Sequence, residues 1–401
     1  MPIISQKGHR MPASPIRKLV PFADGAKKRG TKVYHLNIGQ PDLPTPKPFW
    51  DTLAHLNMEV LAYCPSDGFA SYKAKFSEYY NSLGISVTPS NFIITNGGSE
   101  ALLFGMMSCL NEGDEVIIPE PMYANYIGFA TSGNIVVKPV PCAIENGFAL
   151  PPISEFEKAI SPKTKAILIC NPNNPTGYLY SRQELEVLRE IALKYDLFLF
   201  VDEVYREFVY GDEPHFSALK LEGVTENIVV IDSISKRFSA CGARIGALVT
   251  RNKAVLGAAM KFAQARLSPP SLGQLAGEKL FDLGQPYYEQ VKKQYRSRRD
   301  LTVTLLNAIP GVKCPNPGGA FYVVAELPVS DSDAFCQWML ESFSHEGATV
   351  MMAPANGFYS TKNVGLNQVR IAYVLNEEDI TKALECLRIG LKQYRNLSHK
   401  G

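Results

Sequence analysis

The sequence predicts an α/β protein with a large domain, built on a mostly parallel central sheet flanked by helices, and a smaller α+β domain. Short apolar runs recur along the 401 residues, helix-like segments lie between several of them, and the pattern changes after about residue 285. A continuously apolar run is typical of a strand that is buried on both faces. Strands that alternate with helices favour a parallel sheet with crossover helices.

Seven apolar runs are the expected strands of the large sheet, and most are continuously apolar rather than alternating. They occupy residues 92–95, 116–118, 135–137, 166–170, 197–201, 228–231 and 245–249. A helix is predicted over 181–195, where Ser181 is a suitable N-cap and Glu184 completes a capping box three residues later.

The smaller domain is expected to combine both ends of the chain. Its predicted elements are helices over 287–307, near 331–346 and over 377–395, and strands over 320–325 and 368–374. The first forty residues are interrupted by Pro and Gly and are expected to wrap onto these elements. We therefore expect residues 45–285 to form the large domain, and residues 1–44 with 286–401 to form the small one.

Composition and charge exclude several classes of protein. Apolar residues make up 46% of the chain and charged residues 20%, which excludes disordered, collagen-like and coiled-coil proteins. The net charge is only +2, so a dedicated nucleic-acid binder is not expected. The run Arg296, Arg298 and Arg299 is interpreted as a solvated helix face.

Cysteine spacing and the lack of long apolar segments indicate a cytoplasmic protein. The eight cysteines are scattered and form no C-x-x-C pair, so we expect neither a metal site nor a disulfide framework. No apolar stretch approaches the roughly 18 residues that span a bilayer, and the first residues show no secretory signal. Neither a membrane nor a nucleic acid is an expected partner.

Ligands bind outside the carboxyl ends of the strands in an open parallel sheet, so residues after each run are candidate site residues. Gly98 and Ser99 follow the run 92–95 and open a helix, which is typical of a phosphate-binding turn or simply of a tight connection. Asn174 lies in a proline-rich loop after 166–170, which either holds its amide rigidly or serves only as a stiff connector.

Two further strand ends carry ionisable groups. Asp202 follows the run 197–201, where it either needs a cationic partner or caps a helix, and Tyr205 lies three residues later. Lys236 follows the next run, where a lysine can have a lowered pKa and act as a nucleophile, although a single such lysine is more often a surface residue. With Arg244 and the glycine-rich turn, this combination describes a pyridoxal phosphate site.

In these motifs the chain resembles the class I pyridoxal-phosphate-dependent aminotransferases (the aspartate aminotransferase superfamily, fold type I) over about residues 36–374. The motifs are Asn37-Ile-Gly39-Gln-Pro-Asp, Asn96-Gly-Gly-Ser, Asn173-Asn-Pro-Thr-Gly, Asp202-Glu-Val-Tyr205, Ser233-x-Ser-Lys236 with Arg244-x-Gly246, and Gln368-Val-Arg370-Ile. The resemblance implies pyridoxal 5′-phosphate as cofactor and a ping-pong reaction. An L-amino acid, aspartate as the first choice, gives its nitrogen to a 2-oxo acid such as 2-oxoglutarate.

The resemblance also implies roles for individual residues. Lys236 binds the cofactor's aldehyde and moves the substrate proton, while Asp202 keeps the ring nitrogen protonated. Tyr205 and Asn174 hydrogen-bond the 3-oxygen of the ring. Tyr123 either stacks on the ring, where many members have tryptophan, or is a plain core tyrosine. The residues expected around the cofactor's phosphate are Gly98, Ser99, Ser233, Ser235 and Arg244.

Substrate and subunit contacts follow from the same resemblance. Arg370 is expected to bind the substrate's α-carboxylate, assisted by Gly39 and Asn174. Tyr63 resembles a tyrosine that reaches the partner's phosphate in a homodimer with shared active sites. Arg266 is either a reader of a distal carboxylate or an ordinary helix-end arginine.

Other functions remain open at this point. The donor can instead be alanine or an aromatic amino acid, and the same scaffold can act as a C–S β-lyase or form carboxycyclopropanes. A non-catalytic regulator would carry an N-terminal DNA-binding module, which we do not expect before residue 36. A nicotinamide enzyme would need a G-x-G-x-x-G turn, which Gly97-Gly98 does not supply.

Overall fold

A seven-stranded sheet is the largest feature of the computed structural model, which describes residues 2–398. The strand order is β2-β8-β7-β6-β5-β3-β4, and the strands from β7 to β4 run parallel to their neighbours. Only β8 runs antiparallel, to β2 and to β7. The predicted mostly parallel sheet is therefore confirmed. The strands are β2 (Phe92–Asn96), β3 (Glu115–Glu120), β4 (Val136–Pro141), β5 (Thr164–Cys170), β6 (Phe198–Asp202), β7 (Ile228–Ser233) and β8 (Ile245–Val249).

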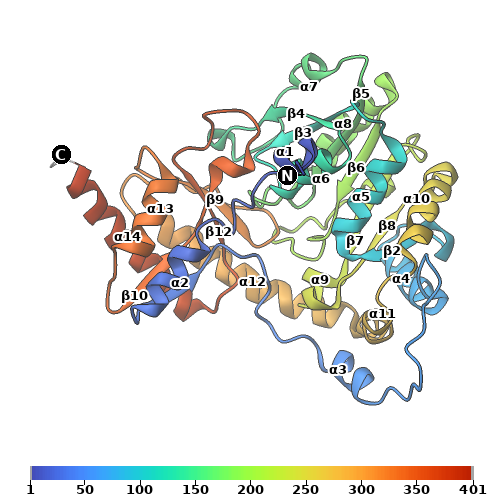
Figure 1. Ribbon diagram of the computed structural model, residues 1–401, viewed down its shortest axis with the longest axis horizontal. Coiled ribbons are helices and arrows are strands. Elements are labelled where there is room, and N and C mark those ends of the chain that lie inside the picture. Colours follow the sequence, from blue (N-terminus) through green and yellow to red (C-terminus); the bar gives the residue numbers. More distant parts are fainter. Residues whose placement is uncertain (1, 399–401) are drawn as a thin grey trace.

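Burial on both faces explains the continuously apolar strands. In β5, Leu168 packs into one core cluster and its neighbours Ile167 and Ile169 pack into another. Helices α5 (Gly97–Cys109) and α8 (Arg182–Tyr195) are among those beside the sheet (Figure 1). The capping box predicted for α8 is present, since Ser181 Oγ accepts from Glu184 N at 3.2 Å and Glu184 Oε2 accepts from Ser181 N at 2.7 Å.

Helices otherwise connect the strands or pack around the second group of strands. They are α1 (Gln6–Arg10), α2 (Val20–Lys28), α3 (Lys47–Ala54), α4 (Ala70–Ser82), α6 (Asn125–Ser132), α7 (Ile153–Ala159), α9 (Ile234–Arg237), α10 (Lys253–Arg266), α11 (Ser271–Glu278), α12 (Gly284–Asn307), α13 (Ser332–Glu341) and α14 (Glu377–Ser398). Each helix among residues 2–398 is too short or too polar to cross a membrane. All eight cysteines lie in this described part and are free thiols.

The second group of strands comes from both ends of the chain. Its strands are β1 (Lys32–His35), β9 (Tyr322–Glu326), β10 (Ala348–Met351), β11 (Ala353–Pro354) and β12 (Gln368–Ala372). β1 pairs in parallel with β10, while β12 lies between β11 and β9. Helix α12 runs between the two groups of elements (Figure 1). On this separation we propose residues 45–285 as the large domain, and residues 2–44 with 286–398 as the small one; the ends of the predicted small domain, residues 1 and 399–401, lie outside the described residues.

The helix expected near 331–346 is shorter than predicted. It ends at Glu341, and β10 begins seven residues later, at Ala348. Glu346 and Gly347 turn the chain between them, with φ of +50° and +75°. The left-handed backbone at these two residues cannot continue a helix.

The prediction of a solvated arginine face on α12 was wrong for two of its three members. Arg298 and Arg299 are only 6% and 8% exposed. Arg298 Nη1 donates to Asp42 Oδ1 and to Val374 O, both at 2.6 Å. A buried cation must be paired, and Arg298 thereby ties α12 to the N-terminal segment.

Candidate active site

One cavity of about 670 Å³ lies where the carboxyl ends of the parallel strands meet the second group of strands. The predicted site residues that line it are Gly39, Gly98, Ser99, Tyr123, Asn174, Asp202, Tyr205, Ser233, Ser235, Lys236, Arg244 and Arg370. Two predicted residues, Tyr63 and Arg266, do not line it. Groups that are far apart in sequence therefore share one site.

Lys236 lies in the short helix α9, directly after β7. Its Nζ donates to Gly39 O at 2.9 Å and lies 3.8 Å from Cys241 Sγ. Burial lowers the pKa of the Lys236 ammonium, and the positive charge of Arg370 acts in the same direction. A lysine in this state is more readily deprotonated and therefore a better nucleophile toward an aldehyde.

A buried ion cluster anchors the short helix that carries Lys236. Asp232 accepts from Arg206 Nη1 at 3.2 Å and from Arg237 Nη2, and Glu203 accepts from Arg206 Nη2 at 2.6 Å. Two cations and two anions balance, so the cluster buries no net charge. Because Arg237 follows Lys236 directly, this anchoring fixes the backbone from which the lysine projects into the cavity.

Asp202 ends β6 and is 5% exposed. Its Oδ2 accepts from Tyr126 Oη at 2.8 Å and its Oδ1 accepts from Val204 N at 3.3 Å. Burial raises the pKa of this carboxyl group to about 6, although the hydrogen bond from Tyr126 acts to lower it. No arginine or lysine among residues 2–398 forms an ion pair with Asp202, so a cationic ligand would be favourable here.

The N-terminus of α5 and Arg244 form a second corner of the cavity. Gly98 and Ser99 stand in the first turn of α5, where free N–H groups and the helix dipole attract anions. Arg244 has φ of +55°, a strained conformation for a residue with a side chain. Its guanidinium lies so close to Gly97 that a Cβ there would be 2.3 Å from Nη2. The glycine therefore makes room for the arginine.

Two serines complete this anion-attracting corner. Ser233 Oγ donates to Ile245 O at 2.8 Å and lies 2.7 Å from Ser235 Oγ. It also accepts from Ser235 N at 3.0 Å, which fixes the turn between β7 and α9. Together with Arg244, these hydroxyl groups suit a phosphate.

Arg370, on β12, is a buried cation without an anionic partner among residues 2–398. Nη1 donates to Asn174 Oδ1 at 3.1 Å and Nη2 donates to Asn37 O at 2.5 Å, while Nε finds no hydrogen-bond partner in the described part of the chain. Burial lowers the pKa of the guanidinium. A buried cation that meets only neutral acceptors is suited to a carboxylate ligand, which it can bind through two parallel hydrogen bonds.

The aromatic side chains of the site are mutually fixed. Asn174 Nδ2 lies 3.4 Å from Tyr205 Oη, and Tyr205 Oη lies 3.0 Å from Tyr322 Oη. Tyr123 packs edge-on against Tyr126 with ring centroids 5.3 Å apart. Tyr126, which holds Asp202, and Tyr322 were not found by sequence reasoning, because both read as ordinary apolar positions.

The two predicted residues outside the cavity have other surroundings. Arg266 Nη1 pairs with Glu100 at 2.9 Å and Nη2 donates to Ser66 O at 2.9 Å, which makes it a structural helix-end arginine rather than a reader of a distal carboxylate. Tyr63 is 79% exposed. Arg17, which sequence reasoning did not single out, lines the cavity instead.

These residues fit pyridoxal phosphate. One cavity holds a nucleophilic amine (Lys236), a buried acid that pairs with no arginine or lysine among residues 2–398 (Asp202), and the anion-attracting corner at Arg244. The unpartnered Nε of Arg370 leaves a place for a carboxylate in the same cavity. The arrangement can therefore hold an aldehyde, a protonated ring nitrogen, a phosphate and an amino acid at once.

Comparisons with known proteins agree with this fit. The family described as aminotransferase class I and II matches residues 31–387. An aspartate aminotransferase of Pyrococcus horikoshii is 31% identical over 90% of this chain and 91% of its own. An aromatic-amino-acid aminotransferase of Thermococcus litoralis is 29% identical over 95% and 96%. A single mutant of Thermus thermophilus aspartate aminotransferase superposes with a TM-score of 0.88 at 29% identity, covering 97% of this chain and 100% of its own.

Proposed function

Because the chain belongs to the class I and II aminotransferases, transferases that use pyridoxal 5′-phosphate, we propose that it moves the amino group of L-aspartate to a 2-oxo acid such as 2-oxoglutarate. The observation that carries this proposal is the buried Arg370, which has no acidic partner among residues 2–398 and lies in the same cavity as Lys236 and Asp202. Such a cavity supplies a carboxylate anchor beside a nucleophilic amine. Both substrates of an aminotransferase carry the carboxylate.

When bound, pyridoxal phosphate supplies an aldehyde that links to amines and a protonated ring that draws electrons from the substrate's α-carbon. Asp202 holds the proton of the ring nitrogen, because a buried carboxylate gains most from a cation in contact with it. Tyr205 and Asn174 would bind the ring oxygen. The phosphate would lie against Gly98, Ser99, Ser233, Ser235 and Arg244, and Tyr123 would cover the ring.

Arg370 and Lys236 act on the substrate. The guanidinium of Arg370 donates two hydrogen bonds to the α-carboxylate and so orients the Cα–H bond. Lys236 Nζ, whose pKa is lowered by burial, takes the proton from the α-carbon and returns it as a general acid. The backbone of Gly39, which accepts from Lys236 Nζ, keeps the amine at this place in the cavity.

Arg17 supports a dicarboxylic substrate. It lines the same cavity, and within residues 2–398 its exposed guanidinium pairs with no carboxylate. Of the other cations that line the cavity, Lys236, Arg244 and Arg370 already have roles above. Arg17 is therefore the cation available for the second carboxylate of aspartate or 2-oxoglutarate.

We predict that Arg17→Gln lowers kcat/KM for L-aspartate by about tenfold to a hundredfold, the loss expected for one charge-assisted hydrogen bond. The value for L-alanine should stay within about threefold, since alanine has no second carboxylate. The measurement is a half-reaction screen, in which the loaded enzyme is mixed with single amino acids and the fall in visible absorbance is recorded.

Arg10→Gln is the matched control, because Arg10 is exposed in the same N-terminal segment and does not line the cavity. Equal losses for aspartate and alanine would remove the role of Arg17. A preference for alanine or aromatic donors in the wild type would replace aspartate as substrate. Release of pyruvate and ammonia without any oxo acid would instead indicate a β-lyase.

We also propose that the functional unit is a homodimer. The segment around α3 projects from the body of the chain (Figure 1). This segment carries exposed apolar side chains. They are Trp50, Met58, Val60, Leu61 and Tyr63, with 44% to 79% of each exposed. Solvent-exposed apolar patches of this kind are typical of subunit interfaces. A second copy that covers this patch would bring Tyr63 toward the partner's anion-attracting corner at Arg244.

Tyr63→Phe is predicted to raise the dissociation constant of pyridoxal phosphate about tenfold or more, because a hydrogen bond to a charged group contributes about 1.5–3 kcal/mol. The ring is kept, so the dimer itself should persist in analytical ultracentrifugation. Cofactor affinity is measured by fluorescence titration of the cofactor-free protein. Unchanged affinity in a dimeric variant would exclude this contact.

A further inference from the structure

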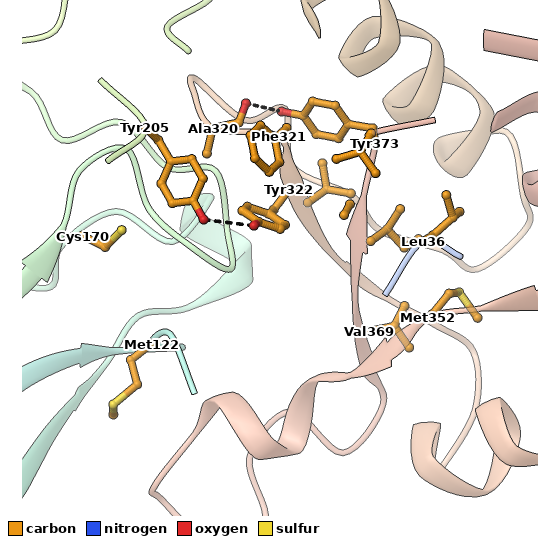
Figure 2. Close-up of a cluster of buried hydrophobic side chains, with 14 of the residues drawn as sticks. Leu36, Met122, Cys170, Tyr205, Ala320, Phe321, Tyr322, Met352, Val369 and Tyr373 are labelled. Carbon is orange, nitrogen blue, oxygen red and sulfur yellow. Dashed lines mark hydrogen bonds between the residues drawn. The ribbon is translucent and has the colours of Figure 1, made fainter. Parts of the chain in front are cut away.

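The hydroxyl groups of Tyr205 and Tyr322 meet across the boundary between the two groups of strands. Figure 2 shows the two phenols pointing toward each other, with Tyr205 from the loop after β6 and Tyr322 from β9. Their oxygens are 3.0 Å apart and both side chains are at most 3% exposed. Each hydroxyl has one hydrogen, so only one of the two can donate to the other.

Tyr322 is held in one position by its surroundings. Its hydroxyl lies against Gly39, where a Cβ would be 1.7 Å from the tyrosine oxygen. The guanidinium of Arg370 lies 4.7 Å from the centre of its ring. Gly39 and Arg370 are themselves bound to Lys236 and Asn174, at 2.9 and 3.1 Å. Tyr322 therefore lies between Gly39, which binds the amine of Lys236, and Arg370, the proposed carboxylate anchor.

Three observations decide which phenol donates. Gly39 O, the other acceptor near Tyr322, is 3.5 Å away and already accepts from Lys236. Burial raises the pKa of both phenols, but the charge of Arg370 opposes this rise at Tyr322. Of two paired hydroxyls, the more acidic one is the better donor. Both observations therefore favour Tyr322 as the donor and Tyr205 as the acceptor.

The third observation concerns Asn174. Its Oδ1 accepts from Arg370 Nη1, so its Nδ2 must face Tyr205 and can only donate there. The Tyr205 oxygen is thus approached by donors from two sides. Its own hydrogen is left to point into the cavity, which Tyr205 lines.

We propose that Tyr322 is a positioning residue that donates its hydrogen to the Tyr205 oxygen and so reserves the Tyr205 hydrogen for the 3-oxygen of the cofactor ring. Accepting this bond also makes Tyr205 a stronger donor, since hydrogen bonds in a chain polarise one another. The inference rests on the role proposed for Tyr205. It does not depend on which amino acid is the substrate.

The test is a pH titration of the visible absorbance of the enzyme loaded with pyridoxal phosphate, without substrate. A stronger donor at the ring oxygen draws negative charge away from it, favours loss of the proton that the oxygen shares with the lysine nitrogen, and so lowers the pH midpoint of the change in visible absorbance. Tyr322→Phe, which removes only the hydroxyl, should therefore raise the midpoint by about 0.3–1 pH unit. Tyr205→Phe should raise it further, and adding Tyr322→Phe to Tyr205→Phe should cause no additional shift.

Tyr373→Phe is the matched control. Tyr373 is as deeply buried, donates to Ala320 O at 3.1 Å (Figure 2), and does not line the cavity, so its loss should leave the midpoint unchanged. An unchanged or lowered midpoint in Tyr322→Phe would overturn the proposal, because a lowered one means that Tyr205 donates to Tyr322. A Tyr205→Phe variant with the wild-type midpoint would overturn it as well. Failure to turn over aspartate would affect only the proposed substrate.

Discussion

Replacement of Lys236 by alanine is expected to abolish transamination, with kcat/KM falling by about 10⁴-fold or more. The variant loses both the amine that links to the cofactor and the base that moves the substrate proton, and no other lysine among residues 2–398 lines the cavity. The yellow colour of the loaded protein should disappear as well. Steady-state kinetics and an absorbance spectrum of the purified variant measure the two effects.

Two comparisons make this result specific. Lys253→Ala, at an exposed lysine outside the cavity, should keep the wild-type spectrum and rate. Lys236→Arg keeps a positive charge in the cavity but cannot link to an aldehyde, and should be as inactive as the alanine variant. Either Lys236 variant with a tenth of the wild-type activity would end the assignment.

Asp202→Asn should separate function from stability. We expect kcat/KM to fall by about 10²- to 10³-fold, because the amide cannot hold the proton of the ring nitrogen. The cofactor-free variant, in contrast, should be more stable than the wild type at neutral pH. It no longer buries a carboxylate that has a hydrogen bond from Tyr126 but no cationic partner.

The sign of the pH dependence follows from the pKa of Asp202. Burial raises this pKa from 3.8 to about 6, so the folded state binds the proton more tightly than the unfolded state. Stability from this group is complete below about pH 4 and is lost as the pH rises to about 6, by about 3 kcal/mol in total. Asparagine does not titrate, so the variant's advantage should grow over this window and stay constant above it.

Chemical denaturation of the cofactor-free proteins at pH 4, 5, 6 and 7 gives the difference in the free energy of unfolding. A difference that does not change between pH 4 and pH 7 would show that Asp202 is not perturbed. A wild type more stable than the variant at pH 7 would show that the carboxylate has a favourable partner.

Much of the fold could be predicted because buried strands and helix caps leave local signals. The seven apolar runs lie in the seven strands of the large sheet, although the runs at 135–137 and 197–201 begin one residue before β4 and β6. The capping box at Ser181 and Glu184 depends only on neighbouring residues. The orientation of β8 depends instead on the direction of its partners β2 and β7, which no local pattern contains.

The residues of the site also divide into those that a local sequence pattern reveals and those that only the tertiary structure brings together. Residues that follow strand ends, such as Asp202 and Lys236, could be predicted because the carboxyl ends of parallel strands converge. Tyr322 and Arg17 enter the cavity from β9 and from the N-terminal segment, and only the tertiary structure brings them there. The burial of Arg298 is of the same kind, since its partner Asp42 is distant in sequence.

Borohydride reduction of the loaded protein, followed by peptide mapping, identifies the residue that links to the cofactor. Reduction makes the bond between the cofactor and a lysine permanent. We expect a single modified lysine, at position 236. A label on any other lysine, or none in protein that is fully loaded with cofactor, would contradict it.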